Sequence, residues 1–423
     1  MKILILGTGA REHALADGLA KKHQVFLAPK RVFLANHIQS IAVDICNPKD
    51  VLTCALDIRP DFIIIGPEMP LFYGVSDILR QHGFLVLGPS QYAAQIETSK
   101  VFAKTLMRQQ GIRTADFCVI KNQQDLDHFC AHHQGPAVVK ADGLMAGKGV
   151  LMCDSNAQIK TAAQYLWAQG QHTLLIESRL NGPEVSLMAI CHGRSYALFP
   201  LARDYKRLHA DKNAPNTGGM GSFAPLHLSA QEFSQHQIQN IQDLGHAFIA
   251  PVLDAFMEQK QPYIGFLYAG LLFHQGVFYA LEYNARLGDP ETQSILTILD
   301  QDLGDLFSAF VQPQQSPTQS PMIVASSHRH AVCVVLAAAG YPDKPQLGAV
   351  ITGIKEAQQI PQISIFGAGI GQDEHQRFIV TGGRVLSVVA YAATQVQAQS
   401  LAYQAAACID FTGKTIRNDI ATE

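Results

Sequence analysis

The residues best suited to chemistry stand in one polar run, residues 282–291, at the end of a predicted strand. Glu282 and Asn284 are two positions apart, so on a strand both side chains point to one face, where a carboxylate and an amide oxygen can bind a hard cation. Mg²⁺ is the expected metal, with Mn²⁺ as a substitute, because Mg²⁺ is commonly shared between one or two protein ligands and nucleotide phosphates. Arg286 follows on the same face and can hold a carboxylate or an acyl phosphate through two hydrogen bonds. A solvated strand end explains one such group but explains three aligned groups poorly.

A second segment, residues 138–150, combines lysines with glycines. Glycines let the backbone approach phosphate oxygens, and a lysine supplies a compact positive charge for a transferred phosphoryl group. The segment lacks the Lys-Ser/Thr ending of a P-loop, and a solvated loop could have the same composition. Its candidate residues are Lys140, Gly143, Gly147, Lys148 and Gly149.

An irregular segment, residues 204–221, mixes charges, an amide, a hydroxyl and several glycines. These groups suit a polar, phosphorylated or zwitterionic substrate, although many surface turns share this composition. Its candidate residues are Asp204, Lys206, Arg207, Asn216, Thr217 and Gly218.

Two weaker motifs stand elsewhere. Residues 7–13 follow a predicted strand and open a helix, so their backbone amides could meet a phosphate at the helix N-terminus, or could simply form a tight turn. The third glycine of a dinucleotide fingerprint would fall at Glu12, which disfavours a nicotinamide cofactor.

His128 and His132 share a helical face near Cys130, but no second ligand pair accompanies them, so an exposed polar helix is preferred to a zinc site.

The composition restricts the class of protein. The 423 residues predict two to four domains, and 32 Lys and Arg against 35 Asp and Glu give no positive surplus for nucleic acid. No apolar run approaches the ~20 residues of a membrane helix, and no signal peptide is recognisable. The eight scattered cysteines form no Cys-x-x-Cys pair and suggest reduced thiols. We expect a soluble cytoplasmic protein with small-molecule partners, neither nucleic acid nor membrane, as a monomer or weak homodimer.

Three regions must position these groups. Residues 1–88 alternate short apolar runs (3–6, 25–28, 62–65 and 84–87) with helical segments, which predicts an α/β domain with a parallel sheet. From Ser99, a helix to Gln110 precedes an α+β region. Its predicted strands are 137–140, 173–177 and 184–190, followed by a hairpin of 265–273 and 277–283 joined at 274–276. Residues 312–321, rich in Pro, Gln and Ser, predict a linker or loop before a third module with strands 330–339, 350–354 and 385–391.

The motifs in this order resemble the phosphoribosylamine-glycine ligase (glycinamide ribonucleotide synthetase) family of de novo purine synthesis. Further segments carry the resemblance, namely 66–71, 88–90, 99–100, 265–270, 340–342 and 382–386. It implies a Rossmann-like pre-ATP-grasp domain over residues 1–99. An ATP-grasp domain would follow over 100–311, with a lid at about 118–190, and a C-terminal α+β domain would span 322–423.

The resemblance also implies residue roles. Lys100, Lys140 and Lys148 would contact ATP phosphates beside Gly143, Gly147 and Gly149, Glu177 to Leu180 would form the adenine hinge, and Glu184 would hold the ribose. Glu282 and Asn284 would bind the metal, and Arg286, Lys148, Asp204 and Lys206 would serve catalysis. Glycine would become glycyl phosphate, which the amine of phosphoribosylamine attacks. The substrate-binding residues would be Gly9, Arg11, Glu12, Glu68, Asp204, Lys206, Arg207, Asn216, Thr217, Gly218, Arg286, Gly288, Asp289, Pro290 and Glu291.

Three departures from the family pattern lie on the amine side. Pro29 is followed by Lys30 and Arg31 where the family has a Gly-Asn-x-Gly-Thr turn, Ala10 replaces a glycine, and residues 211–215 form a loop one residue shorter. Lys30 and Arg31 could replace amide contacts to a phosphate with charge. The alternatives are a paralogue that joins another acid and amine, or a nucleotide-binding pseudoenzyme, against which the intact lysines and the 282–286 cluster argue.

Overall fold

The N-terminal sheet is parallel, as predicted, and it holds five strands in the order β3-β2-β1-β4-β5, of which β3 was not among the four predicted strands. Both faces of β1 are buried: Leu4 and Leu6 pack into one apolar cluster, and Ile3 and Ile5 into another. The computed structural model describes residues 1–422 except 36, 146–148, 212–213, 229–239 and 313–320. The elements of this region are β1 Lys2–Leu6, α1 Ala10–Ala20, β2 Gln24–Ala28, β3 Gln39–Ser40, α2 Pro48–Ile58, β4 Phe62–Ile65, α3 Glu68–Phe72, α4 Val75–Gln81 and β5 Val86–Leu87.

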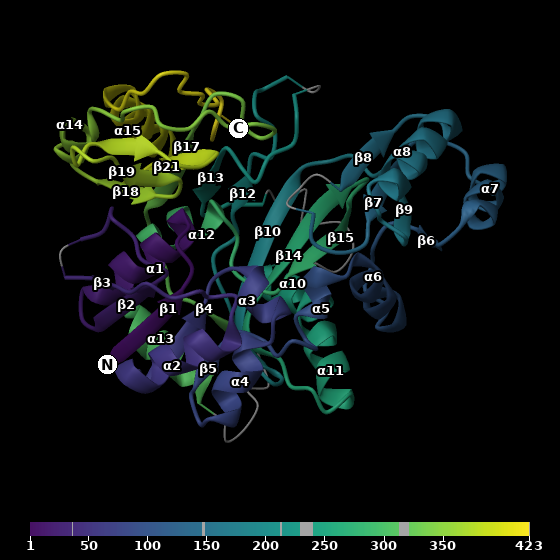
Figure 1. Ribbon diagram of the computed structural model, residues 1–423. Coiled ribbons are helices and arrows are strands. Elements are labelled where there is room, and N and C mark those ends of the chain that lie inside the picture. Colours follow the sequence, from purple (N-terminus) through teal and green to yellow (C-terminus); the bar gives the residue numbers. More distant parts are fainter. Residues whose placement is uncertain (36, 146–148, 212–213, 229–239, 313–320, 423) are drawn as a thin grey trace.

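The large sheet forms the centre of the molecule, with strand order β15-β14-β10-β11-β16 (Figure 1). The predicted hairpin is confirmed: β14 and β15 pair antiparallel, with a register shift at Gly270/Leu271. Strand β10 pairs along its whole length with β14. The elements of this region are α5 Gln95–Thr98, α6 Lys100–Gln109, β10 Glu184–His192, β11 Ser195–Leu198, α10 Ile241–Phe248, α11 Ala250–Glu258, β14 Ile264–His274, β15 Val277–Asn284, α12 Glu291–Ile298, α13 Leu303–Val311 and β16 Met322–Ile323.

A small antiparallel sheet lies beside the large one and has its own apolar cluster (Figure 1). Its strand order is β6-β9-β7-β8. The expected lid of about residues 118–190 included β10, but β10 belongs to the large sheet, so the small sheet and its helices span 117–178. The elements are β6 Phe117–Ile120, α7 Gln123–His132, β7 Ala137–Ala141, β8 Val150–Cys153, α8 Asn156–Ala168 and β9 Leu174–Ser178.

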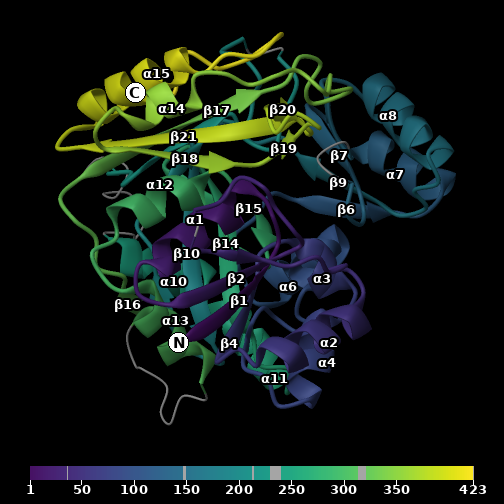
Figure 2. The same ribbon diagram turned by 60° about the vertical axis from the view of Figure 1, so that its left-hand side comes forward.

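The C-terminal sheet has the strand order β12-β13-β17-β21-β18, and its strands β12 and β13 come from earlier in the chain. It packs on α12 and α1, above them in the view of Figure 2. The strand predicted over 350–354 is wrong, because Val350 and Thr352 form only isolated bridges and Ile354 begins a helix. The elements are β12 Arg203–Asp204, β13 Gly221–Ala224, β17 His330–Ala337, α14 Ile354–Gln358, β18 Ile363–Gly367, β19 Ile370–Gln372, β20 Phe378–Val380, β21 Arg384–Ala392 and α15 Gln395–Cys408.

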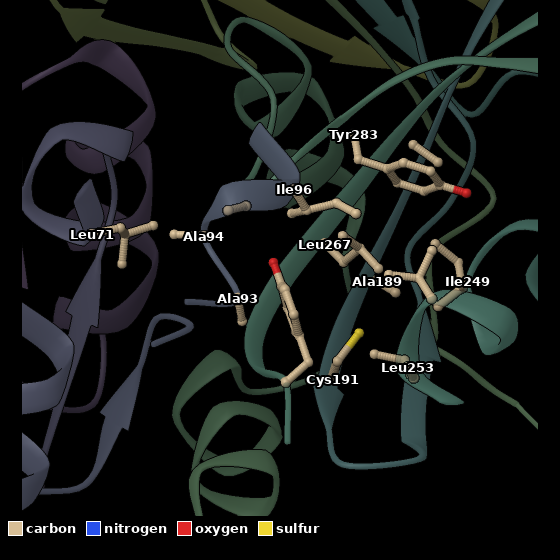
Figure 3. Packing of buried hydrophobic residues seen from close by; sticks show 14 of the residues in the cluster. Leu71, Ala93, Ala94, Ile96, Ala189, Cys191, Ile249, Leu253, Leu267 and Tyr283 are labelled. Carbon is tan, nitrogen blue, oxygen red and sulfur yellow. The ribbon is translucent and has the colours of Figure 1, made fainter. Parts of the chain in front are cut away.

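One apolar cluster joins the N-terminal region to the large sheet. Figure 3 shows Leu71 on one side, Ala93, Ala94 and Ile96 between, and Leu267 on the sheet, and all five residues are buried. Burial of continuous apolar surface fixes these elements relative to one another. In the described part of the chain, no helix is long and apolar enough to cross a membrane.

Candidate active site

A cavity of about 1050 Å³ is lined by residues of the N-terminal region, the large sheet, the small sheet and the C-terminal region. It brings together most of the residues predicted from the sequence, although these come from widely separated segments. Gly147 and Lys148 lie outside the described residues, and Leu180, Glu184, Asp204, Arg207 and Pro290 do not line the cavity. The predicted residues that line it are Gly9, Arg11, Glu12, Glu68, Lys100, Lys140, Gly143, Gly149, Glu177, Lys206, Asn216, Thr217, Gly218, Glu282, Asn284, Arg286, Gly288, Asp289 and Glu291.

Glu282 and Asn284 occupy the end of β15, opposite Gly270 and Tyr268 of β14, and both line the cavity. Gly270 faces Glu282 without a side chain of its own, which leaves room there. Burial raises the pKa of Glu282, but nearby cations outweigh this effect and lower it, namely Lys206, Lys140 and Arg286. This carboxylate is therefore ionised at neutral pH. Within the described residues it makes no hydrogen bond or ion pair. A charged oxygen donor beside an amide oxygen fits a hard divalent cation.

Lys140, at the end of β7, makes an ion pair with Glu177 of β9, and the same carboxylate lies 2.7 Å from Lys104 Nζ. Although burial opposes it, Lys140 and Lys104 lower the pKa of Glu177. Burial lowers the pKa of Lys104 to about 8. The sequence analysis missed Lys104, which stands four positions after Lys100 on α6 and hence near it on the helix. Glu177 thus anchors one lysine of the cavity wall through its side chain.

The N-terminus of α6 is tied to the loop after β7. Lys100 Nζ donates to the carbonyl of Gly143 at 2.8 Å. The Asp142 carboxylate accepts hydrogen bonds from the Ser99 hydroxyl and the Val101 amide, both at 3.1 Å. The segment predicted to enclose phosphates is therefore attached to the helix that carries Lys100.

Arg286 is held by two carboxylates from the N-terminal side. Its Nη2 lies 3.0 Å from Glu97 Oε1, and its Nε lies 3.5 Å from Glu68 Oε2. Glu97 also accepts the Ala285 amide at 2.8 Å. Burial lowers the pKa of Arg286, but the carboxylates of Glu97 and Glu68 outweigh this effect and raise it. Burial raises the pKa of Glu97 to about 7, although the nearby Arg286 lowers it. Sequence analysis missed Glu97, because nothing local distinguishes it from a surface glutamate.

Lys206, in the connection between β12 and β13, lines the cavity, and its Nζ lies 2.8 Å from Asp204 Oδ2. Although burial favours the neutral amine, the Asp204 carboxylate raises the pKa of Lys206 well above its usual value. The Arg207 guanidinium donates to the Ala214 carbonyl at 2.9 Å, inside the loop. Both Asp204 and Arg207 therefore support the loop, whereas Lys206 faces the cavity.

The loop after β15 meets the C-terminal sheet at Asp289. Arg384 of β21 lies 2.8 Å from the Asp289 carboxylate and donates to the carbonyls of Asp289 and Gly218. The Tyr341 hydroxyl accepts the Gly218 amide at 3.0 Å. Although burial opposes it, Arg384 lowers the pKa of Asp289. Arg384 and Tyr341 line the cavity but were not predicted as site residues, because the sequence places them more than a hundred residues from Gly218.

The first turn of α1 closes one wall. Gly9 donates its amide to Glu12 Oε2 at 2.6 Å, and Arg11 donates to the Leu287 carbonyl at 3.0 Å. Gly7 has φ +126°, and a Cβ there would lie 2.6 Å from Glu12, so both backbone conformation and space require glycine. Ala10 begins the helix and replaces the family's glycine without a positive φ.

The two basic residues after Pro29 differ in their surroundings. Arg31 is buried and donates to the Ala368 carbonyl at 2.5 Å, and it does not line the cavity. Lys30 is exposed. Of the two, only Lys30 is free to meet a ligand from solution.

The histidines of α7 form no metal centre. His132 Nδ1 and the His128 carbonyl are 2.8 Å apart, and the two rings lie 4.4 Å apart. Across the described residues, no group of three His, Cys, Asp or Glu side chains could hold a metal ion. Both His128 and His132 are exposed on this helix.

Three family models match the chain. They are described as phosphoribosylglycinamide synthetase N domain (residues 1–97), ATP-grasp (A) domain (98–292) and C domain (331–423). The phosphoribosylamine–glycine ligase of Leifsonia xyli subsp. xyli is 37% identical over 427 residues, covering 100% of this chain and 99% of that protein.

Solved structures agree with the family match. The phosphoribosylamine–glycine ligase of Thermotoga maritima has a TM-score of 0.82 at 32% identity, covering 99% of this chain and 100% of that one. The biotin carboxylase domain of Hydrogenobacter thermophilus 2-oxoglutarate carboxylase, solved with MgADP and bicarbonate, has a TM-score of 0.69 at 14% identity. It covers 98% of this chain and 91% of that one, and the likeness concerns the fold alone.

Proposed function

This chain belongs to the phosphoribosylglycinamide synthetase family, and we propose that its large cavity is the place where glycine is joined to phosphoribosylamine. The protein is an ATP-dependent ligase of purine biosynthesis with the ATP-grasp fold. In the proposed route, a glycine carboxylate oxygen attacks the γ-phosphorus of ATP and ADP leaves. The amine of phosphoribosylamine then attacks the carbonyl carbon of glycyl phosphate. Phosphate leaves, the nitrogen loses a proton, and glycinamide ribonucleotide is formed.

The nucleotide would lie between the small and large sheets. Lys100 and Lys140 line this part of the cavity and would meet the phosphates. Apolar side chains of the same wall, Met107, Leu151 and Leu175, offer a surface to a flat base. The backbone of residues 177–180 would bind the adenine edge, since the Glu177 carboxylate is engaged by Lys104 and Lys140. For Gly147, Lys148 and Glu184 the contacts with phosphate and ribose remain proposals from the family resemblance.

A divalent metal accompanies ATP in this fold, and Mg²⁺ is the one we propose. Glu282 and Asn284 would hold it, because they present oxygen donors side by side and Glu282 carries an unpaired charge among the described residues. When bound, the metal would neutralise charge on the phosphate oxygens. Arg286, held by Glu97 and Glu68, would orient the carboxylate or acyl phosphate.

The acid and amine would occupy the opposite end of the cavity, lined by the loops that carry Lys206, Gly218 and Asp289 and by the first turn of α1. Preorganised cations and aligned reactants can each supply several kcal/mol of barrier lowering. Lys206 would contact the substrates directly, and Asp204 would hold Lys206 in place through their ion pair. We also propose that the enzyme works in the cytoplasm, since its eight cysteines are free thiols. A monomer or weak homodimer stays a proposal from the sequence.

The observation that carries the proposal is that Lys100, Lys140, Glu282, Asn284 and Arg286 line one cavity. The test is ADP release with ATP, Mg²⁺ and glycine, with and without phosphoribosylamine generated in situ, and with the product identified by mass. We expect glycinamide ribonucleotide only in the full mixture. ADP without this product would favour a paralogue with another amine or acid, and ATP binding without turnover would favour a pseudoenzyme.

A further inference from the structure

The C-terminal sheet contributes a side chain that touches both substrate-side loops. Arg384 Nη1 donates to the Gly218 carbonyl at 2.8 Å and to the Asp289 carbonyl at 2.7 Å. Its Nη2 donates to Asp289 Oδ2 at 2.8 Å. One guanidinium therefore connects the loop between β12 and β13 with the loop between β15 and α12.

The two loops fit closely where Arg384 meets them. A Cβ on Gly219, whose φ is +114°, would lie 2.5 Å from Pro290 and 2.7 Å from Asp204. Asp289 receives a further hydrogen bond from Gln293 of α12 at 2.7 Å. Tyr341 accepts the Gly218 amide from the C-terminal side. A small displacement of either loop would therefore break several contacts together.

The backbone that carries Arg384 is fixed by its own sheet. Arg384 pairs with Ala337 of β17, and its carbonyl accepts the Gly369 amide at 2.8 Å. Rigid elements hold functional side chains more accurately than loops do. The planar guanidinium can also reach a carboxylate and two carbonyls at once, which a lysine ammonium on a flexible stem does less well.

We propose that Arg384 is a positioning residue of the ligase site, through which the C-terminal domain fixes Asp289 and Gly218 for the amino acid and the amine. The inference rests on the proposed function of the cavity. It predicts that the C-terminal domain affects the acid and amine side while the nucleotide side, built on the lysines of α6 and β7, is largely independent of it.

The test compares Arg384→Gln and Arg384→Lys with Arg377→Gln in the same domain, where Arg377 forms an exposed pair with Asp373. Steady-state kinetics are measured for glycine, phosphoribosylamine and ATP, and ATP affinity is measured separately by equilibrium binding. For Arg384→Gln we expect kcat/KM for glycine and phosphoribosylamine to fall about 100-fold, as misplacement of reacting groups by about 1 Å can cause. The ATP affinity of Arg384→Gln should change less than about twofold. The kcat/KM values of Arg384→Lys should lie between those of the wild type and Arg384→Gln, and Arg377→Gln should match the wild type.

Amide hydrogen exchange supplies a readout that needs no substrate. Arg384→Gln should speed exchange in residues 214–220 and 285–291, and Arg377→Gln should not. Unchanged exchange in these loops, or an equal loss of ATP affinity, would overturn the inference. If the wild type makes no glycinamide ribonucleotide, the proposed function fails, and hydrogen exchange alone then decides the structural role of Arg384.

Discussion

Replacing Glu97 with glutamine should make the protein more stable at alkaline pH but less active. Glu97 has 5% of its side chain exposed and faces Arg286. Burial raises its pKa from 4.5 to about 7, and the nearby Arg286 offsets this only in part. A raised pKa means that the folded state favours the neutral acid, so ionisation of Glu97 reduces stability as the pH rises from 4.5 through about 7.

The size of this effect follows from the pKa values. One pKa unit corresponds to about 1.4 kcal/mol, so the rise of the Glu97 pKa from 4.5 to about 7 should lower the free energy of unfolding by about 3 kcal/mol above pH 7. At about 2.1 cal/mol/K per residue, unfolding 423 residues as one unit carries an entropy of about 0.9 kcal/mol/K. The melting temperature of Glu97→Gln relative to wild type should therefore rise by about 3 °C between pH 5 and pH 8.

The assay is thermal unfolding at several pH values without ATP or Mg²⁺, alongside kcat/KM for glycine over the same range. Ionised Glu97 holds Arg286, so the wild type should gain activity as the pH rises through about 7, and Glu97→Gln should lack this rise. Glu374→Gln serves as control, because 86% of that side chain is exposed. A stability difference that is the same at pH 5 and pH 8, or a pH–activity profile unchanged by Glu97→Gln, would refute the reasoning.

Three further changes test other parts of the site. Glu282→Gln should leave the melting temperature unchanged but reduce ADP release by at least about 100-fold by weakening the metal site, and unaltered activity would remove the metal assignment. Lys104→Met should cost roughly 2 kcal/mol in urea unfolding, because it removes a buried charge-assisted hydrogen bond to Glu177, which keeps Lys140 as its second partner. The exposed Lys160→Met should cause no measurable loss, and equal effects would contradict the role of burial. Lys30→Ala should raise KM for phosphoribosylamine and spare ATP affinity, and an equal change in both would refute a phosphate contact by Lys30.

The sequence identified the chemistry that depends on local order. Glu282 and Asn284 follow from a period of two on a strand, which places alternate side chains on one face, and β15 has that geometry. Arg286 was predicted on the same strand face, but β15 ends at Asn284, so Arg286 lies in the segment after the strand. The parallel N-terminal sheet and the β14–β15 hairpin were likewise predicted, since buried apolar runs and a Gly-containing turn are local signals. The family motifs extended the assignment to further residues of the cavity wall.

Tertiary structure decided which distant groups meet. Glu97 and Lys104 stand in segments with no motif around them. Tyr341 and Arg384 stand in segments that carry the family resemblance, but nothing local assigned them to the site, and only the packing of the sheets brings all four to the cavity. It also placed β10 in the large sheet and paired β12 with β13 and β13 with β17, because strand pairing depends on long-range hydrogen bonds that no local pattern encodes. The same packing turned Arg31 toward Ala368 and left Lys30 exposed, although the two are neighbours in the sequence. Residue type and spacing thus determined what the site could do, and burial and pairing of distant segments determined which side chains hold it in place.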